Sequence, residues 1–195
     1  MKIRIAAAAL ILLLAVLLSA CGSTAPEGVA VPADMKLISP DTADYYLFVP
    51  DDWRSDISTG VVTAYYSDSD PTNISMMVFS LGGEEMTYAQ YWDRYSEQFS
   101  EIYDGYELSE SGETVLGGVS AGKYVYSGKF AQKADDASEG ETANDDFPAA
   151  GEYKFQTVVA IRGGNIYILT YSAKASVYES HIGDFEDIQL NFLFK

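Results

Sequence analysis

Two apolar stripes at helical spacing constrain the fold more than any other feature of this sequence. A helix with a single apolar stripe must bury that stripe against another layer of structure. The segments around the two stripes are typical of strands, so each helix is expected to cover one face of a sheet. The first stripe comprises Tyr88, Trp92, Tyr95, Phe99 and Ile102, and the second Tyr178, Ile182, Phe185 and Ile188.

Capping residues mark where the two helices begin and where the first one ends. Thr87, with Gln90 three residues later, predicts a capping box at the start of the first helix. The pair at 104–105, Asp-Gly, predicts its end, because glycine readily adopts the left-handed conformation that terminates helices. Ser176, with Glu179 three residues later, predicts the start of the second helix in the same way.

The other periodic segments are rich in β-branched and aromatic residues and are predicted to be strands. They cover residues 44–50, 60–68, 73–81, 106–116, 121–130, 152–162 and 165–173. Gly163 and Gly164 separate the last two segments and are typical of a hairpin turn. Strands joined by short turns pair antiparallel. The sequence therefore predicts an α+β fold, an antiparallel sheet of about six to seven strands flanked by helices.

The single cysteine, Cys21, excludes an intrachain disulfide, so the core alone must hold the fold. Before it come two basic residues, an apolar run over residues 5–18 and two small residues, which is the layout of a secretory signal. The apolar run is short for a membrane span, which needs roughly 20 residues. These features predict export of the chain from the cytoplasm.

The four residues that end at Cys21, Leu-Ser-Ala-Cys, resemble the bacterial lipobox at every position. The resemblance implies a diacylglyceryl group on the Cys21 thiol and removal of residues 1–20 as a lipoprotein signal peptide. Residues 21–34 would then form an acylated N-terminus and a flexible tether, and residues 35–195 a single domain. The implied location is the extracytoplasmic face of the cell membrane. A plain signal peptide, with Cys21 a free thiol, is the alternative, and a transmembrane anchor is a weaker one.

The chain is strongly acidic, with 29 Asp and Glu against 12 Lys and Arg and a formal net charge of −17. This charge argues against a nucleic-acid partner and against electrostatic docking on anionic lipid. The membrane contact is therefore expected to depend on the lipid at Cys21, and a partner protein or envelope ligand is expected to approach the domain itself.

An acidic segment at residues 131–150 has one lysine and one large apolar residue. It cannot bury enough apolar surface to offset its ordering entropy, so it is predicted to be a mobile loop inserted between two strands. A weak calcium site, or an acidic contact for a basic partner, is the functional alternative. The candidate cation ligands are Asp135, Asp136, Glu139, Glu141, Asp145 and Asp146.

Four segments resemble motifs of PsbP/Mog1-like domains. They are FVPDDW at 48–53, VLGGVSAGKYVYSG at 115–128, IYILTYSA at 166–173, and IQLNF at 188–192, where Asn191 replaces the serine of the family. The resemblance covers about residues 36–195 and implies an α/β/α sandwich. The family includes photosystem II extrinsic subunits, a Ran-binding protein and bacterial lipoproteins. The resemblance therefore supports the fold and the lipid-anchored class, and it transfers no active site.

A Gly-x-Ser-x-Gly motif at residues 118–122 matches the nucleophile elbow of hydrolases, which requires a helix after the serine. The residues after Ser120 alternate like a strand, so a glycine-rich turn is predicted instead. His181, the single histidine, is expected to be partly buried or at the surface. Residues 68–73 lack the glycine and glutamate of an EF-hand loop and are predicted to form a polar turn.

Most of the fifteen tyrosines fall at core positions of the predicted elements. One of Tyr65 and Tyr66, and one of Tyr124 and Tyr126, is expected to face outward and could line a sugar-binding groove.

The favoured hypothesis is a lipid-anchored, non-enzymatic protein that binds a partner or stabilises an envelope complex. An envelope hydrolase is the second hypothesis, although no nucleophile, base and orienting group can be placed together. A low-affinity divalent-cation-binding protein is the third. No cofactor is expected, and metal candidates are restricted to the acidic segment.

Overall fold

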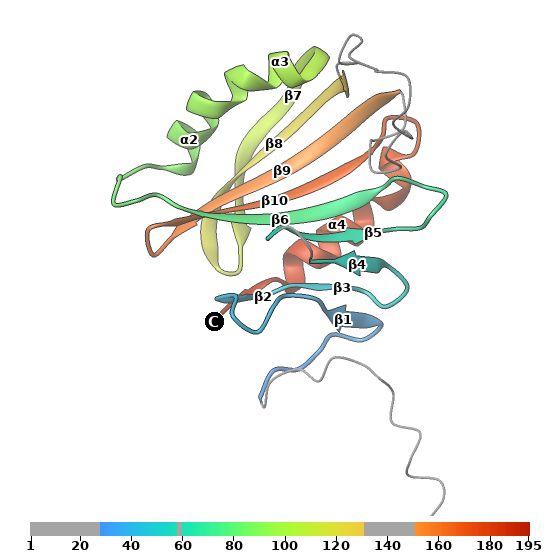
Figure 1. Cartoon of the computed structure of the whole chain (residues 1–195), viewed down its shortest axis with the longest axis vertical. Coiled ribbons are helices and arrows are strands. Elements are labelled where there is room, and N and C mark those ends of the chain that lie inside the picture. Colours follow the sequence, from blue (N-terminus) through green and yellow to red (C-terminus); the bar gives the residue numbers. More distant parts are fainter. Residues whose placement is uncertain (1–27, 58–59, 131–150) are drawn as a thin grey trace, which may run out of the picture.

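The computed structural model describes residues 28–57, 60–130 and 151–195, which form one curved antiparallel sheet with helices on both faces (Figure 1). The sheet has seven strands in the order β4-β5-β6-β10-β9-β8-β7. Their bounds are Arg54–Asp56 (β4), Val62–Tyr65 (β5), Asn73–Ser80 (β6), Tyr103–Leu116 (β7), Val119–Phe130 (β8), Glu152–Arg162 (β9) and Asn165–Lys174 (β10). The predicted α+β class and the antiparallel sheet are confirmed.

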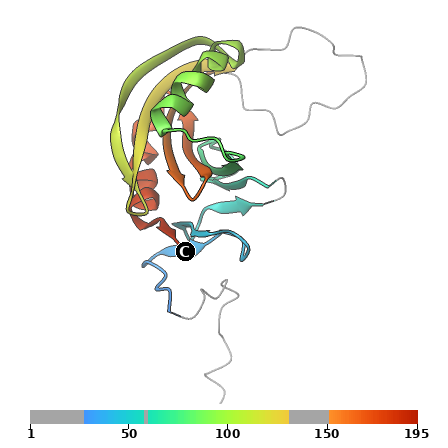
Figure 2. The same cartoon turned by 90° about the vertical axis from the view of Figure 1, so that its left-hand side faces the viewer.

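The helices lie on opposite faces of the sheet (Figure 2). One face carries α2 (Tyr88–Tyr95), a 3₁₀ turn η1 (Ser96–Gln98) and α3 (Phe99–Ile102), and the other carries α4 (Tyr178–Asn191). Alternate residues of β10 divide between the two layers: Ile168 packs in the cluster with Trp92 of α2, whereas Leu169 packs in the cluster with Phe185 of α4. Since successive strand residues point to opposite faces, this division establishes an α/β/α arrangement.

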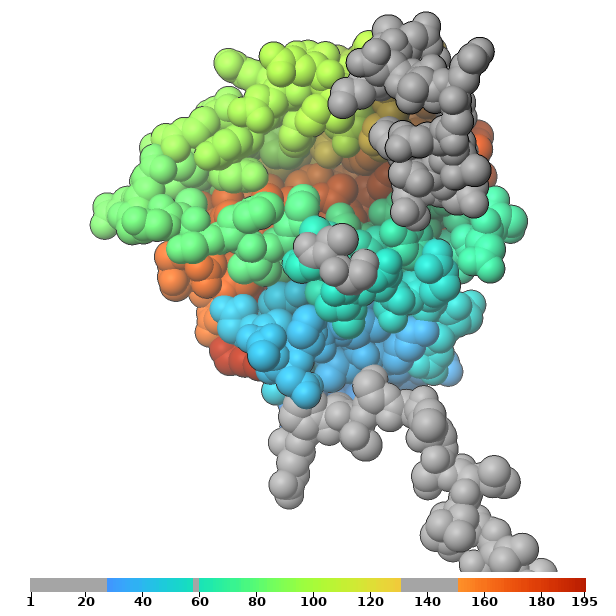
Figure 3. All heavy atoms as spheres, viewed as in Figure 1, coloured from blue at the N-terminus to red at the C-terminus, as the bar shows by residue number. Residues whose placement is uncertain are grey.

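The face under α2 holds a cluster of aromatic rings. Trp92 lies on Tyr124 with ring centroids 3.9 Å apart and an interplanar angle of 1°, and Phe99 stacks on Tyr126 at 5.3 Å. Both tyrosines are therefore buried, and the expectation that one of them faces outward is wrong. Residues two apart in a strand share a face, so a helix that covers one covers the other. In the space-filling view, part of the sheet stays visible between the helical segment α2–α3 and β6 (Figure 3).

The predicted strand over residues 44–50 is in fact two strands that belong to two small sheets. β2 (Tyr45–Tyr46) pairs with β11 (Leu193–Phe194), and β3 (Phe48–Pro50) pairs with β1 (Met35–Leu37). Neither joins the main sheet, whose first edge is β4. β2 therefore joins the start of the domain to its last strand, beside the end of α4.

The capping box of α2 is confirmed. The Gln90 amide donates to Thr87 Oγ1 at 3.2 Å, and the Thr87 amide donates to Gln90 Oε1 at 2.9 Å. The helical segment, however, ends at Ile102, before the predicted Asp-Gly pair. Its path changes at η1, and because a 3₁₀ turn has three residues per turn the apolar stripe loses its register. Ile102, which follows the turn, is accordingly 47% exposed, whereas Tyr95, which precedes the turn at the end of α2, is 36% exposed.

The apolar stripe of α4 is confirmed, but its predicted cap is wrong. Tyr178, Phe185 and Ile188 are buried, as the spacing predicts. The helix begins after Val177, which provides no side-chain cap, and Glu179 instead forms an ion pair with Lys154 at 3.0 Å. No helix within the described ranges is long and apolar enough to cross a membrane.

Candidate functional site

The Gly-x-Ser-x-Gly segment forms a turn and a strand, as the sequence predicts. Gly117 and Gly118 have φ angles of 55° and 82°, and β8 begins immediately after them at Val119. Ser120 pairs with Val115 of β7. A nucleophile elbow places its serine between a strand and a helix, so this serine has no such geometry.

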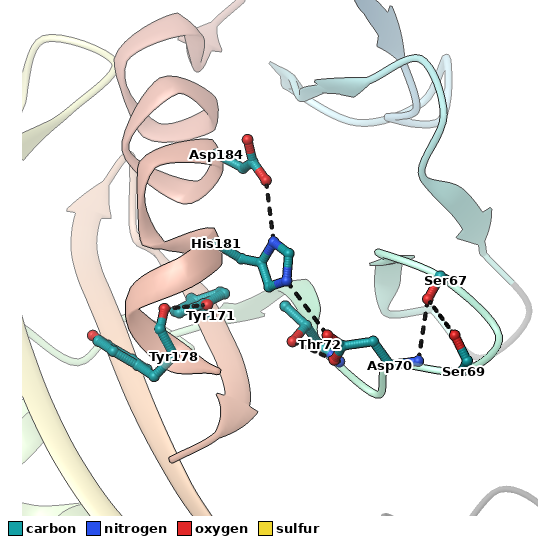
Figure 4. A network of polar contacts seen from close by, with 8 residues as sticks. All are labelled: Ser67, Ser69, Asp70, Thr72, Tyr171, Tyr178, His181 and Asp184. Atoms are coloured by element: carbon teal, nitrogen blue, oxygen red, sulfur yellow. Dashed lines mark hydrogen bonds and ion pairs between the residues drawn. The ribbon is translucent and has the colours of Figure 1, made fainter. Parts of the chain in front are cut away.

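His181 lies on α4 between two carboxylates (Figure 4). Its Nε2 is 3.4 Å from Asp70 in the β5–β6 turn, and its Nδ1 is 3.8 Å from Asp184 one helical turn later. The ring also packs on Tyr66 with centroids 3.9 Å apart. The side chain is 13% exposed, so the expectation of a partly buried histidine is confirmed. Tyr66 is half-buried and packs between His181 of α4 and Trp53.

The two carboxylates beside His181 differ in their pKa. At Asp70, burial favours the neutral acid, but hydrogen bonds from Thr72 and the nearby His181 outweigh it, and the pKa is lowered. At Asp184, burial dominates over the attraction of His181, and the pKa is raised. The Thr72 amide and hydroxyl donate to Asp70 Oδ1 at 3.0 and 2.7 Å, which confirms the predicted polar turn.

This polar cluster holds the β5–β6 turn to the start of α4 and lies away from Ser120. The strand partner of Ser120, Val115, accepts a hydrogen bond through its carbonyl from Gln189 at 2.9 Å. His181 precedes Gln189 by eight residues of helix, which is about 12 Å at 1.5 Å per residue. No contact in the described parts of the chain joins Ser120 to His181, so the hydrolase hypothesis has no geometric support.

The predicted lipid-attachment and cation-ligand residues lie outside the part of the chain that the structure describes. Cys21 is one of them, and so are Asp135, Asp136, Glu139, Glu141, Asp145 and Asp146. Within the described ranges, no group of three or more Asp, Glu, His or Cys side chains is arranged to hold a metal ion. The anchor and the acidic-loop site remain predictions.

A groove of about 630 Å³ lies between the β7–β8 hairpin and the C-terminal half of α4. The two elements lie side by side in both cartoon views (Figures 1 and 2). Gln189 fixes their spacing, because its Nε2 donates to both Thr114 Oγ1 and the Val115 carbonyl at 2.9 Å. The turn at Gly117 and the fully buried ring of Phe192 also line the groove.

Three large apolar side chains around this groove are exposed to solvent. Leu190 at the end of α4 is 80% exposed, Leu193 in β11 is 45% exposed, and Val115 in β7 is 55% exposed. They form the apolar rim. One residue of the apolar rim could have been noticed in the sequence. Leu190 follows Ile188 by two residues and therefore lies outside the buried stripe of α4. An apolar residue on the outer side of a helix has no role in the core.

Charged residues on the groove and its flanking elements are mostly acidic. Lys123, the one base among the described residues that line the groove, forms an ion pair with Glu110 of β7. Glu186 also lines the groove and has no ion-pair partner among the described residues. Neither α4 nor β7 contains Lys or Arg. Their acids are Glu179, Asp184, Glu186 and Asp187 on α4, and Asp104, Glu107, Glu110 and Glu113 on β7.

The fold resembles two solved structures. The first is cyanobacterial PsbP (CyanoP) from Synechocystis sp. PCC 6803, with a TM-score of 0.58 and 14% identity, over 91% of this chain and 99% of that chain. The second is the Ran-binding protein Mog1p of Saccharomyces cerevisiae, with a TM-score of 0.52 and 10% identity, over 82% and 95%. No family model and no curated protein matches the sequence. The PsbP/Mog1-like fold is therefore confirmed, and identities this low establish nothing beyond the fold.

Proposed function

We propose that this chain is a cell-envelope lipoprotein, anchored through Cys21, whose domain binds a partner protein without catalysing a reaction. The observation that carries the binding role is the apolar rim of the groove. Scattered surface leucines need no explanation, but apolar side chains gathered at a concave site are typical of interaction surfaces. Here Val115, Leu190 and Leu193 gather there from three different elements.

The comparison with Mog1p supports a binding role for this fold. That protein is described as Ran-binding, so a sheet with helices on both faces can serve to bind another protein. The identity of 10% transfers neither the partner nor the surface. The binding surface proposed for this chain is therefore inferred from its own groove and not from Mog1p.

The anchor depends on the sequence. The lipobox-like residues end at Cys21, and the tether of residues 21–34 precedes β1. A flexible chain of this length spans roughly 20 Å on average, which would keep the domain close to the membrane surface. A lipid chain gains about 0.8 kcal/mol for each buried CH₂ group, and stable anchoring takes two or more chains.

Replacement of Cys21 by alanine in the full-length chain tests the anchor. We expect the wild type to take up a palmitate analogue and to sediment with membranes. The Cys21→Ala variant should do neither, and Ser19→Ala, two residues before the lipidated position, serves as a control that keeps the thiol. A variant without Cys21 that is still labelled would contradict the lipoprotein assignment.

A photo-crosslinking residue at position 190 tests the binding role. It would be introduced into the full-length chain in its native cells, with position 79 as the matched control. Phe79 is a large apolar residue, 52% exposed, on β6 and away from the groove. We expect a specific protein adduct from position 190 and none from position 79. Equal labelling from both positions, or none from position 190, would contradict the proposal.

A further inference from the structure

The groove also indicates the chemistry of its partner. We propose that it binds a protein segment in which leucine-sized apolar side chains are flanked by lysine or arginine. This inference rests on the proposed binding function and adds the character of the ligand. It follows from the apolar rim, from the charge on the α4 wall, and from the exclusion of other occupants.

The apolar rim indicates which side chains of the partner segment would enter the groove. Leu190 and Leu193 flank the groove from one side and Val115 from the other. A volume of about 630 Å³ falls in the range of sites that enclose a ligand of several side chains. Interfaces derive most of their affinity from a few apolar or aromatic anchors that enter such pockets. Leucine-sized side chains match a rim that is itself made of leucine and valine.

The walls of the groove set the charge of the segment. The α4 wall presents Glu186 at the groove, and Asp187 is exposed next to it. On the β7 side, Glu110 is the partner of Lys123. Glu113 points to the other face of the sheet, where it accepts a hydrogen bond from Tyr88 of α2. Complementary potentials steer partners and fix their register, so a basic residue beside the apolar anchor suits the acidic α4 wall.

A second copy of this chain fits the groove poorly. A symmetric contact would place the same surface on both subunits, so the acidic α4 walls, with Glu186 and Asp187, would lie close to each other. Like charges opposed across an interface cost several kcal/mol. Anionic lipid and nucleic acid meet the same repulsion. The partner that remains is a basic protein segment.

The test uses the full-length chain in phosphatidylcholine nanodiscs, with empty nanodiscs as the blank. Three short fluorescent peptides serve as probes: one with paired leucines between lysines, one with glutamate in place of lysine, and one with serine in place of leucine. Binding is followed by fluorescence anisotropy. We expect the lysine–leucine peptide to bind at least about tenfold more tightly than either of the others, since it alone supplies both the anchor and the charge.

Matched variants locate the binding. Leu190→Ser and Glu186→Gln should each weaken binding of the lysine–leucine peptide several-fold. Phe79→Ser and Glu97→Gln remove an exposed apolar group and an exposed charge elsewhere, and should leave it unchanged. Since Leu190 is 80% exposed, its replacement leaves the core intact, and a melting curve checks this.

Three results would overturn the inference. One is equal weakening by the groove and control variants, which would mean general attraction to an acidic protein. Another is tight binding of the glutamate peptide. The third is a photo-crosslink from position 190 to a segment without basic residues, or to a second copy of this chain. A crosslink to a non-basic segment of another protein would leave the proposed function standing, whereas the absence of any crosslink would remove the proposed function itself.

Discussion

Replacement of Trp92 by alanine should destabilise the domain strongly. Trp92 is 5% exposed and is the buried residue of α2. It stacks on Tyr124 at 3.9 Å and contacts Phe99 edge-on at 5.4 Å. Removal of the indole would therefore separate the helical layer from β8 and leave a cavity between them.

The expected magnitude follows from these contacts. Truncation of a buried tryptophan or phenylalanine to alanine costs about 3–5 kcal/mol, and this range includes the cavity left behind. An aromatic pair adds about 0.5–1.5 kcal/mol beyond its buried area, which places this site toward the upper part of that range. For a domain of this size, 1 kcal/mol lowers the melting temperature by about 2–4 °C. The predicted fall is therefore about 6–20 °C.

Urea unfolding followed by tryptophan fluorescence measures the effect. Trp53 is 1% exposed in the other core cluster, so it reports unfolding after Trp92 has been removed. Tyr95→Ala is the matched control on the same helix, because Tyr95 is 36% exposed and contacts Tyr91 at its surface. The control should lose less than about 1 kcal/mol. A Trp92→Ala variant no less stable than the control would refute the existence of a second core under α2.

Two further predictions concern a turn and the buried tyrosines. Gly117→Ala should lose about 1–3 kcal/mol of stability, because φ is 55° and an added Cβ would meet Phe194 Cδ2 at 2.7 Å. Gly118→Ala, with φ of 82° and nothing within 4 Å, should lose less in the same urea unfolding assay, and equal losses would show that the contact is unimportant. Burial raises the pKa of Tyr45 and of Tyr103 to about 12, with the Asp44 charge adding to the effect at Tyr45. Because the folded pKa is raised, the stabilisation is complete below about pH 10 and is lost as the pH rises through about 12. Phenolate absorbance and circular dichroism should therefore change together in alkali, and full ionisation near pH 10 with the fold intact would contradict the burial of these rings.

Six strands of the main sheet and both helices could be predicted because their patterning is local, whereas the edge strand β4, three exposed polar residues, was not predicted. The stripe of α4 and the hairpin at residues 163–164 depend on neighbours in sequence, and both are confirmed. β2 and β11 have two residues each and pair with each other; the predicted strand over residues 44–50 includes β2 without indicating its partner, and no local pattern indicates β11. The cap of α4 failed for a related reason: Glu179 pairs with Lys154 of β9, a residue distant in sequence.

The groove could be predicted only in part. Its leucine at position 190 is visible as an apolar residue outside the helical stripe. Its other wall depends on the β7–β8 hairpin reaching α4, where Gln189 contacts Thr114 across 75 residues of sequence. The separation of Ser120 from His181 is likewise a property of the folded chain. The sequence offers a serine motif and a single histidine, whereas in the fold Ser120 pairs with Val115 of β7 and His181 lies on α4 between Asp70 and Asp184.

Hydrogen bonds and ring contacts join the walls of the groove to each other. Gln189 bonds the β7 carbonyl of Val115, and the Gly117 turn lies so close to the Phe194 ring that a side chain would not fit. Phe192 packs edge-on against Phe194 at 5.0 Å and stacks on Tyr45 of β2 at 5.5 Å, which connects the floor to the start of the domain. A preformed surface adds little ordering entropy of its own on binding, so the cost of ordering falls on the partner segment. It follows that Gly117→Ala, which moves the floor without touching the apolar rim, should weaken peptide binding together with stability.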